Sequence, residues 1–134
     1  PNALLESFKA TERAVLLGTK SFWEGVDVPG ESLSVVVITK LPFDVPTDPL
    51  IAARSEMYED SFNQYYLPEA ILKFRQGFGR LIRTASDRGI VAILDRRVLT
   101  KQYGRLFLES LPPCTARQGP AGNLLREAGN WLGM

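Results

Sequence analysis

The sequence has no histidine and only a single cysteine, Cys114, among its 134 residues. One cysteine excludes an internal disulfide. A chain with one cysteine and no histidine also offers too few nitrogen and sulfur ligands for a zinc or iron–sulfur site. We therefore expect no metal site built from this chain.

Long apolar runs and a strong net charge are absent as well. No run approaches the ~20 residues of a membrane-spanning helix, and no signal peptide is visible, so we expect a cytoplasmic protein without a membrane partner. The 16 basic and 15 acidic residues leave a net charge of +1. A nucleic acid would therefore have to bind a local patch, because no bulk positive field surrounds the protein.

A third absence concerns phosphate binding. The chain has no G-x-x-x-x-G-K-S/T segment, the loop that cradles phosphates in P-loop proteins. It also has no Asp-Glu pair of the magnesium-binding kind at a strand end. The chain begins at Pro1 rather than at a methionine, so we expect a single domain cut from a longer protein.

Three short apolar segments are typical of β-strands. Residues 14–19, 33–39 and 89–95 each contain a continuous run of Val, Ile, Leu and Ala. Runs that are apolar on both sides belong to parallel sheets covered by helices. Because helical patterns separate these runs, the sequence predicts an incomplete α/β sandwich with a mainly parallel sheet.

The helices have clear start and stop signals. Asp48 and Pro49 form an N-cap followed by proline at the first helical position, which predicts a helix to about Tyr66. We expect Pro68 to open the next helix. The other predicted helices cover residues 2–10, residues 101–111 after a Thr100 cap, and the C-terminal segment after an Asn123 cap, which follows a Pro/Gly-rich loop at 112–122.

The helix after Pro68 carries an arginine-rich face. At about 100° per residue, its apolar residues fall within roughly 100° of arc, and these are Ile71, Phe74, Phe78, Leu81 and Ile82. Gln76, Arg80 and Arg83 cluster within about 60° on the opposite side. No acid lies between Lys73 and Asp87, so two uncompensated guanidiniums beside an amide predict a phosphate-binding fork. The alternative is an ordinary basic helix face.

Two other segments are placed for ligand contact at the carboxyl ends of the predicted strands. The loop at 19–30 follows the first strand, and its alternative interpretation is a connection whose Trp23 packs in the core. Residues 95–97, Asp-Arg-Arg, follow the third strand, and there we expect Arg96 to pair with Asp95. The proline-stiffened segment 41–49 is equally consistent with a rigid connection and with ligand contact.

These segments together resemble a known family. Residues 76–83, QGFGRLIR, are similar to motif VI of superfamily 2 helicases, Q-x-x-G-R-x-x-R. Residues 18–27, GTKSFWEGVD, resemble motif V as it occurs in the DinG and XPD branch. Residues 41–43 and 95–97 also resemble that branch, and the similarity covers roughly residues 1–115, closer to DinG than to XPD.

The resemblance implies the second RecA-like domain of such a helicase. This domain is a three-layer α/β fold with a mainly parallel sheet and no P-loop of its own. The first strand of that fold is largely missing before Asn2, so we expect the domain to be truncated at its N-terminus and to span residues 1–134.

The resemblance also implies roles for individual residues. Arg80 and Arg83 would reach the phosphates of ATP, and Gln76 would help to position the attacking water. Asp27, with Gly25 and Gly79, would lie at the nucleotide. Thr19 and Ser21 would contact the phosphates of a single DNA strand, and Trp23 would stack on a base.

The implied partners are single-stranded DNA and an N-terminal RecA-like domain of the same parent chain, which would hold ATP and Mg²⁺. The iron–sulfur cluster that some relatives carry would lie in that first domain, outside this chain. We expect the parent to be an ATP-dependent DNA helicase with DNA-stimulated ATP hydrolysis, and the isolated fragment to be inactive. One alternative is a non-catalytic module that binds nucleic acid or an acidic partner. Another is a nuclease-associated domain that uses the helicase fold only to hold nucleic acid.

Overall fold

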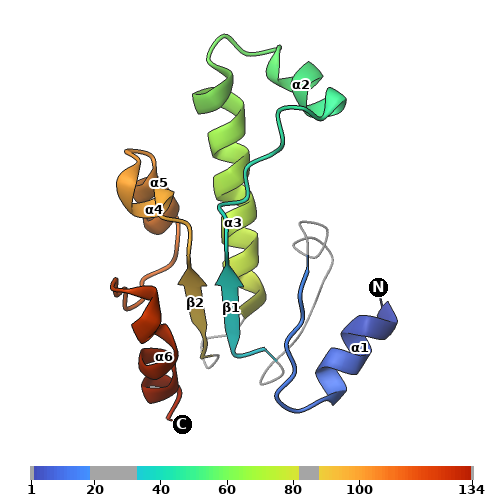
Figure 1. Cartoon of the computed structure of the whole chain (residues 1–134). Coiled ribbons are helices and arrows are strands. Elements are labelled where there is room, and N and C mark those ends of the chain that lie inside the picture. The colour runs from blue at the N-terminus through green and yellow to red at the C-terminus, as the bar shows by residue number, and fades with distance from the viewer. Residues whose placement is uncertain (1, 19–32, 82–87, 134) are drawn as a thin grey trace.

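The structure, a computed structural model, describes residues 2–18, 33–81 and 88–133 (Figure 1). Along the chain its elements are α1 (Asn2–Ala10), β1 (Val35–Ile38), α2 (Pro49–Ser55), η3 (Phe62–Tyr66), α3 (Leu67–Leu81), β2 (Ile90–Ile93), α4 (Arg97–Thr100), α5 (Gly104–Glu109), η4 (Ala121–Asn123) and α6 (Leu124–Leu132). Among the helices in these ranges, none combines the length and apolarity needed to cross a membrane.

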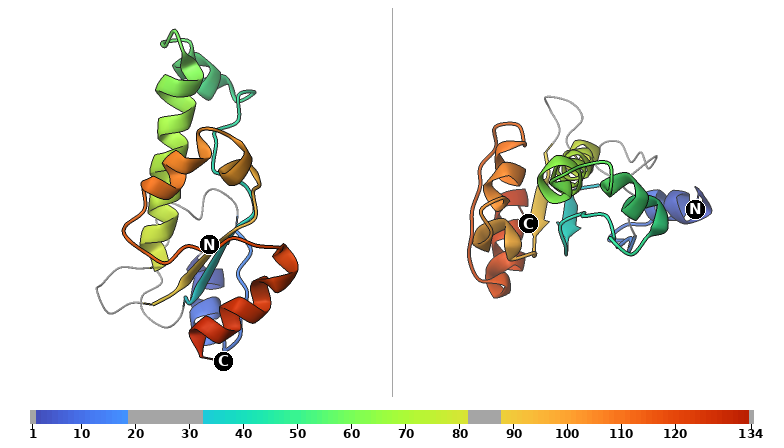
Figure 2. Two further views of the ribbon diagram at one scale, coloured as in Figure 1. Left: turned by 90° about the vertical axis from the view of Figure 1, so that its left-hand side faces the viewer. Right: turned by 90° about the horizontal axis from the view of Figure 1, so that it is seen from above.

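A two-stranded parallel sheet forms the centre of the fold. β1 pairs with β2 in a register that runs from Val35 opposite Ile90 to Ile38 opposite Ile93. Both strands lie inside predicted segments, and their parallel pairing confirms the α/β class. Helix α3 lies on one side of the sheet and α6 on the other (Figure 2).

The hydrophobic core lies between the sheet, α3 and α5. Phe74 of α3 and Phe107 of α5 are fully buried, and their rings meet edge to face with centroids 5.3 Å apart. Burial of such a side chain typically contributes about 1.5–3 kcal/mol. The other buried members of this cluster are Ile38, Leu41, Leu67, Ala70 and Val98.

The expected strand at 14–19 is wrong for its described part, residues 14–18. These residues form no strand, and Val15 and Leu17 are 84% and 86% exposed. Within the described residues β1 pairs only with β2, so segment 14–18 has no strand ladder to fix its backbone. An apolar run becomes a buried strand only when a neighbour and a covering layer are both present.

Helix α2 begins as predicted but ends early. The Asp48 carboxylate accepts hydrogen bonds from the backbone N–H groups of Leu50 (2.9 Å) and Ile51 (3.4 Å), as expected for an N-cap followed by proline. The helix stops at Ser55 rather than near Tyr66. Just after it, backbone hydrogen bonds between residues three apart in the sequence form a turn. The next helical run starts as a π-helix, η3, so Pro68 lies inside a helical run and does not open it.

Two short helices replace the single helix expected at 101–111. The Thr100 hydroxyl donates to the Arg96 carbonyl (3.1 Å) inside α4 instead of capping a following helix. A Cβ on Gly104 would lie 2.1 Å from the Val98 carbonyl oxygen, so α4 and α5 approach each other closely only because residue 104 is glycine.

Helix α6 forms as expected, although the Asn123 side chain makes no capping hydrogen bond. Leu125 on α6 is 88% exposed, because the described elements cover only part of the helix.

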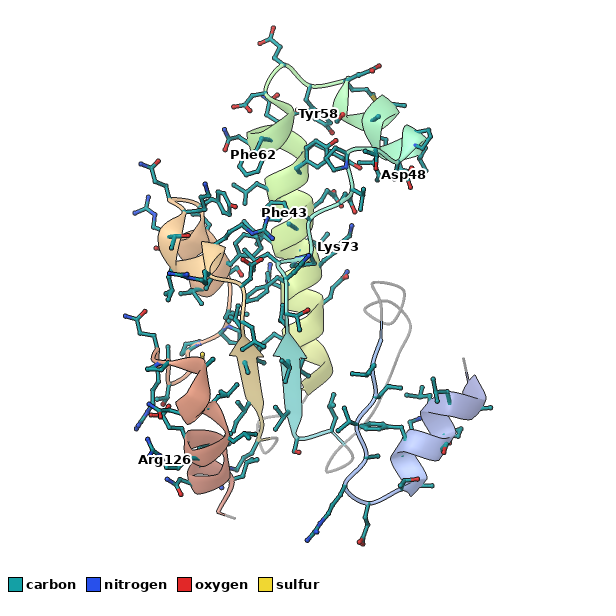
Figure 3. All side chains as sticks on the ribbon, in the orientation of Figure 1. Phe43, Asp48, Tyr58, Phe62, Lys73 and Arg126 are labelled. Atoms are coloured by element: carbon teal, nitrogen blue, oxygen red, sulfur yellow. The ribbon has the colours of Figure 1, made fainter. Side chains whose placement is uncertain are left out.

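A buried ion pair joins α3 to the segment that follows β1. The Lys73 ammonium donates to the Asp44 carboxylate, and their side chains are only 12% and 3% exposed. Figure 3 shows Lys73 midway along α3, level with that segment. Buried charges are costly unless they are paired and hydrogen-bonded, so this contact fixes how α3 sits against the segment.

Replacement of Lys73 tests this arrangement. We expect Lys73→Met to lower the free energy of unfolding by about 3 kcal/mol, because the substitution removes the cation facing a buried carboxylate. Urea unfolding followed by circular dichroism measures the change. Arg75→Met is the matched control: Arg75 is exposed on the same helix, and its loss should change stability by less than about 0.5 kcal/mol. Equal effects of the two substitutions would contradict a structural role for the pair.

Candidate functional site

The C-terminal half of α3 presents its predicted polar face to solvent. Gln76 and Gly79 are exposed, whereas Phe74 and Gly77 are buried. Ile71 and Phe78, which were expected in the core, are half-buried. The buried side of the helix is therefore rotated from the predicted stripe toward Ala70 and Gly77, and the exposure of Gln76 is as predicted.

A shallow hollow of about 360 Å³ lies beside this face. The residues that line it are Leu72, Arg75, Gln76, Phe78, Gly79, Leu111 and Pro112. A Cβ on Gly79 would meet nothing within 4 Å, so packing in the described structure does not require glycine there. The open space leaves the backbone of residue 79 accessible to a ligand.

Several predicted site residues lie outside the described part of the structure. They are Thr19, Ser21, Trp23, Gly25, Asp27 and Arg83. Arg80 belongs to α3, but its side chain is also outside what the structure describes. The described part of the predicted nucleotide site therefore consists of Gln76, Gly79 and the backbone position of Arg80.

Asp95 joins the carboxyl ends of both strands. Its carboxylate accepts a hydrogen bond from the backbone N–H of Leu41, just after β1 (2.8 Å), and another from the backbone N–H of Arg97 (3.0 Å). The Arg97 guanidinium also donates to this carboxylate in a bidentate arrangement. Its Nε lies 3.0 Å from either oxygen, and its Nη2 lies 2.6 Å from Oδ2. One carboxylate thus holds two strand ends and the start of α4.

The expected pairing of Asp95 with Arg96 is wrong. Arg97 makes the ion pair, and Arg96 is exposed. Because the carboxylate already accepts the Arg97 backbone N–H, the Arg97 side chain starts close enough to fold back onto it. The Arg97 side-chain hydrogen bonds hold the pKa of Asp95 well below its usual value, with the Leu41 and Arg97 backbone N–H groups acting in the same direction.

An aromatic cluster at the same strand ends was not predicted. The ring of Phe43 lies 5.8 Å from Phe62, 5.6 Å from Tyr103 and 5.8 Å from Phe107, measured between centroids. The Arg97 guanidinium carbon lies 5.3 Å from the Phe43 centroid. Figure 3 places Phe43 and Phe62 on the side of α3 that faces α4 and α5. The only sequence signal was segment 41–49, for which ligand contact was one of two interpretations beside a rigid connection.

Comparison with known proteins gives a family match over most of the chain. A family model described as helicase C-terminal domain matches residues 1–114. The matched range includes the predicted motif segments and the Asp95 contacts, and it ends within the loop at 112–122 that leads to α6.

Curated relatives agree with this match. A protein named 3'-5' exonuclease DinG from Bacillus subtilis is 52% identical over 116 residues, which cover 84% of this chain and 12% of that protein. The ATP-dependent DNA helicase YoaA of Escherichia coli is 50% identical, covering 82% and 18%. The ATP-dependent helicase DinG of Mycobacterium tuberculosis is 45% identical, covering 84% and 18%. The chain therefore spans less than a fifth of the length of these relatives.

The Asp95 contacts predict an acid-sensitive component of stability. The folded-state pKa of Asp95 lies below the unfolded value of 3.8, so its stabilisation is complete above about pH 5 and is lost progressively as the pH falls below 3.8 toward the lower folded-state pKa. We expect Asp95→Asn to lower the free energy of unfolding at pH 7 by about 2–3 kcal/mol and to flatten its decline between pH 5 and pH 2. Urea titrations across this range measure both effects. An unchanged acid slope in the variant would show that other carboxylates cause the decline.

Proposed function

The chain belongs to the helicase C-terminal domain family, which confirms the resemblance to DinG-type helicases, and from this membership we propose that it is the second RecA-like motor domain of an ATP-dependent DNA helicase. Its partner in that role is a first domain that holds ATP and Mg²⁺. Its own contribution is the motif VI helix, α3. Residues 76–83 of this chain form half of an ATP site that is completed when the two domains close.

The exposure of Gln76 and Gly79 is the observation that carries the proposal. Gln76 lies about one turn before Arg80 and Gly79 directly precedes it, and both are exposed on α3 and available to a ligand from outside the domain. The chain has no P-loop of its own, so the ligand's phosphates have to be held elsewhere. An arginine supplied across a domain interface stabilises charge that develops during phosphoryl transfer.

We assign separate roles to the motif VI side chains. Arg80 and Arg83 place positive charge against the transferring phosphoryl group, and the Gln76 amide orients the attacking water. The buried Lys73–Asp44 pair lies one turn before Gln76 and fixes α3 against the strand ends. Motion of α3 relative to the nucleotide therefore moves the strand-end segments with it, and this rigid coupling suits a motor that changes its grip on a DNA strand.

The loop that follows segment 14–18 supplies the other contacts in this proposal. Asp27 and Gly25 lie near the nucleotide, Thr19 and Ser21 contact DNA phosphates, and Trp23 stacks on a base. These roles rest on the motif V resemblance.

One observation favours a second candidate. The Bacillus subtilis relative is named as an exonuclease, so a domain of this family can occur in a protein named for nuclease activity. In such a protein the fold could serve for grip on a single strand without ATP turnover. The two candidates differ in whether Arg83 matters for catalysis.

Replacement of Arg83 separates them. In a protein that joins this domain to its P-loop partner, we expect Arg83→Ala to lower DNA-stimulated ATP hydrolysis by about 10³-fold or more. ATP binding should weaken only modestly, because the first domain holds most of the nucleotide. A coupled phosphate-release assay measures turnover, and a fluorescent ATP analogue measures affinity.

Arg126→Ala is the matched control, since Arg126 is also an exposed helical arginine but lies on α6 and does not line the hollow beside Gln76. We expect it to retain wild-type turnover. Unchanged ATP hydrolysis in the Arg83 variant would contradict the motor role. DNA binding that persists without any ATP turnover in the wild type would favour the grip-only candidate.

A further inference from the structure

We propose that the aromatic cluster of Phe43, Phe62, Tyr103 and Phe107 is a stacking platform for the bases of a single-stranded nucleic acid. Phe62 is its outer ring. The inference rests on the proposed function, because the strand that it binds would be the track of the motor. It adds a contact surface outside the motif V and motif VI segments.

The cluster has the architecture of a platform anchored in the core. Phe107 is fully buried, Phe43 packs edge-on against it, and Phe62 stacks on Phe43 with an angle of 24° between the rings. Tyr103 closes the side of the cluster, 5.3 Å from Phe62. Phe62 remains 38% exposed, so a rigid, well-supported ring presents free surface to solvent.

The position of the cluster fits a ligand site. Phe43 follows β1 and Tyr103 follows β2, so the rings gather beyond the carboxyl ends of both parallel strands. Ligands of open α/β sheets bind at this edge. Phe62 begins the π-helix η3, a rare conformation that occurs frequently at functional sites.

The charges around the platform have opposite signs on its two sides. Residues 96–109, which include α4 and α5, contain four cations and one acid, Glu109. Three of these cations are exposed, namely Arg96, Lys101 and Arg105. On the η3 side, Glu59 and Asp60 are exposed, and the Asp60 carboxylate accepts hydrogen bonds from Asn63.

This charge distribution favours a single-stranded nucleic acid as the ligand and sets which side of the platform its phosphates occupy. A single strand can place its phosphates along the cationic α4–α5 side and its bases over Phe62, which keeps the phosphates away from Glu59 and Asp60. Base stacking on aromatic side chains is sequence-tolerant and adds to backbone electrostatics. A motor that moves along any sequence needs a contact of this kind.

The test measures binding of the 134-residue chain to a fluorescent twelve-nucleotide oligo(dT) in low salt. We expect Phe62→Leu, which keeps the apolar volume but removes the ring, to weaken binding roughly 5- to 100-fold. Phe62→Tyr keeps the ring and should bind like the wild type. Tyr58→Leu is the matched control, because Tyr58 is 43% exposed but stacks on Tyr65, outside the cluster. Thermal melts establish that each variant is folded.

Two further measurements locate the contact. With three cations at the phosphates, the slope of log K against log salt should be about −2 for a single strand, and Arg105→Gln should reduce its magnitude by about 0.7. Ultraviolet crosslinking of an iododeoxyuridine-substituted oligonucleotide should label the peptides that contain Phe62 or Tyr103.

Equal binding by wild type and Phe62→Leu, an equal loss in Tyr58→Leu, or crosslinks confined to other peptides would each overturn the inference. Capture of a Lys/Arg-rich peptide at Phe62 without any oligonucleotide crosslink would overturn it in favour of a protein partner. The binding assay contains no ATP, so its result is independent of the Arg83 test. A negative result for the stacking platform would not contradict the proposed ATP site, and a negative result in the Arg83 test would not contradict the platform.

Discussion

The Asp95 carboxylate is the contact on which the organisation of this domain depends. It comes directly after β2, accepts the Leu41 N–H that follows β1, and holds Arg97 at the start of α4. Two parallel strands of four residues each cannot by themselves fix the segments that leave them. A charged acceptor that hydrogen-bonds both of these segments can fix them, because charge-assisted hydrogen bonds are roughly twice as strong as neutral ones. The Arg97 guanidinium then covers the Phe43 ring, so the polar contacts and the aromatic cluster support each other.

Helix α3 connects this edge of the sheet to the motif VI residues. Its buried side provides the core residues Ala70 and Phe74, its flank provides Lys73 for the pair with Asp44, and its exposed side provides Gln76. A buried ion pair is weak evidence for added stability, since desolvation offsets much of the attraction. Its clearer consequence is positional, because a lysine that must meet one carboxylate permits only one rotation of the helix. The orientation of Gln76 therefore follows from a contact one turn away.

Local sequence signals predicted the parts of the fold that depend on near neighbours. The apolar runs gave β1 and β2, Asp48 and Pro49 gave the start of α2, and the spacing on α3 gave the exposure of Gln76. Contacts between distant segments carried no such signal. Phe43, Phe62 and Tyr103 meet across 19 and 41 residues of chain, and nothing local brings them together. The choice of Arg97 over Arg96 depends on a backbone hydrogen bond to Asp95, which is a tertiary feature. The end of α2 at Ser55 lacked a glycine or proline to mark it.

The same reasoning explains why segment 14–18 differs from its prediction. Its apolar residues satisfy the pattern of a buried strand, yet Val15 and Leu17 face solvent, because within the described residues neither a pairing strand nor a covering helix is present. Val37 on β1 is also 51% exposed. Isolated exposed apolar residues are common on protein surfaces, but residues whose pattern is that of a core strand are costly to leave in water. A domain that works by closing against a second domain must keep part of its surface uncovered until closure. On the proposed function, the exposed apolar residues and the open face of α3 therefore have one common cause, a nucleotide site that only two domains together complete.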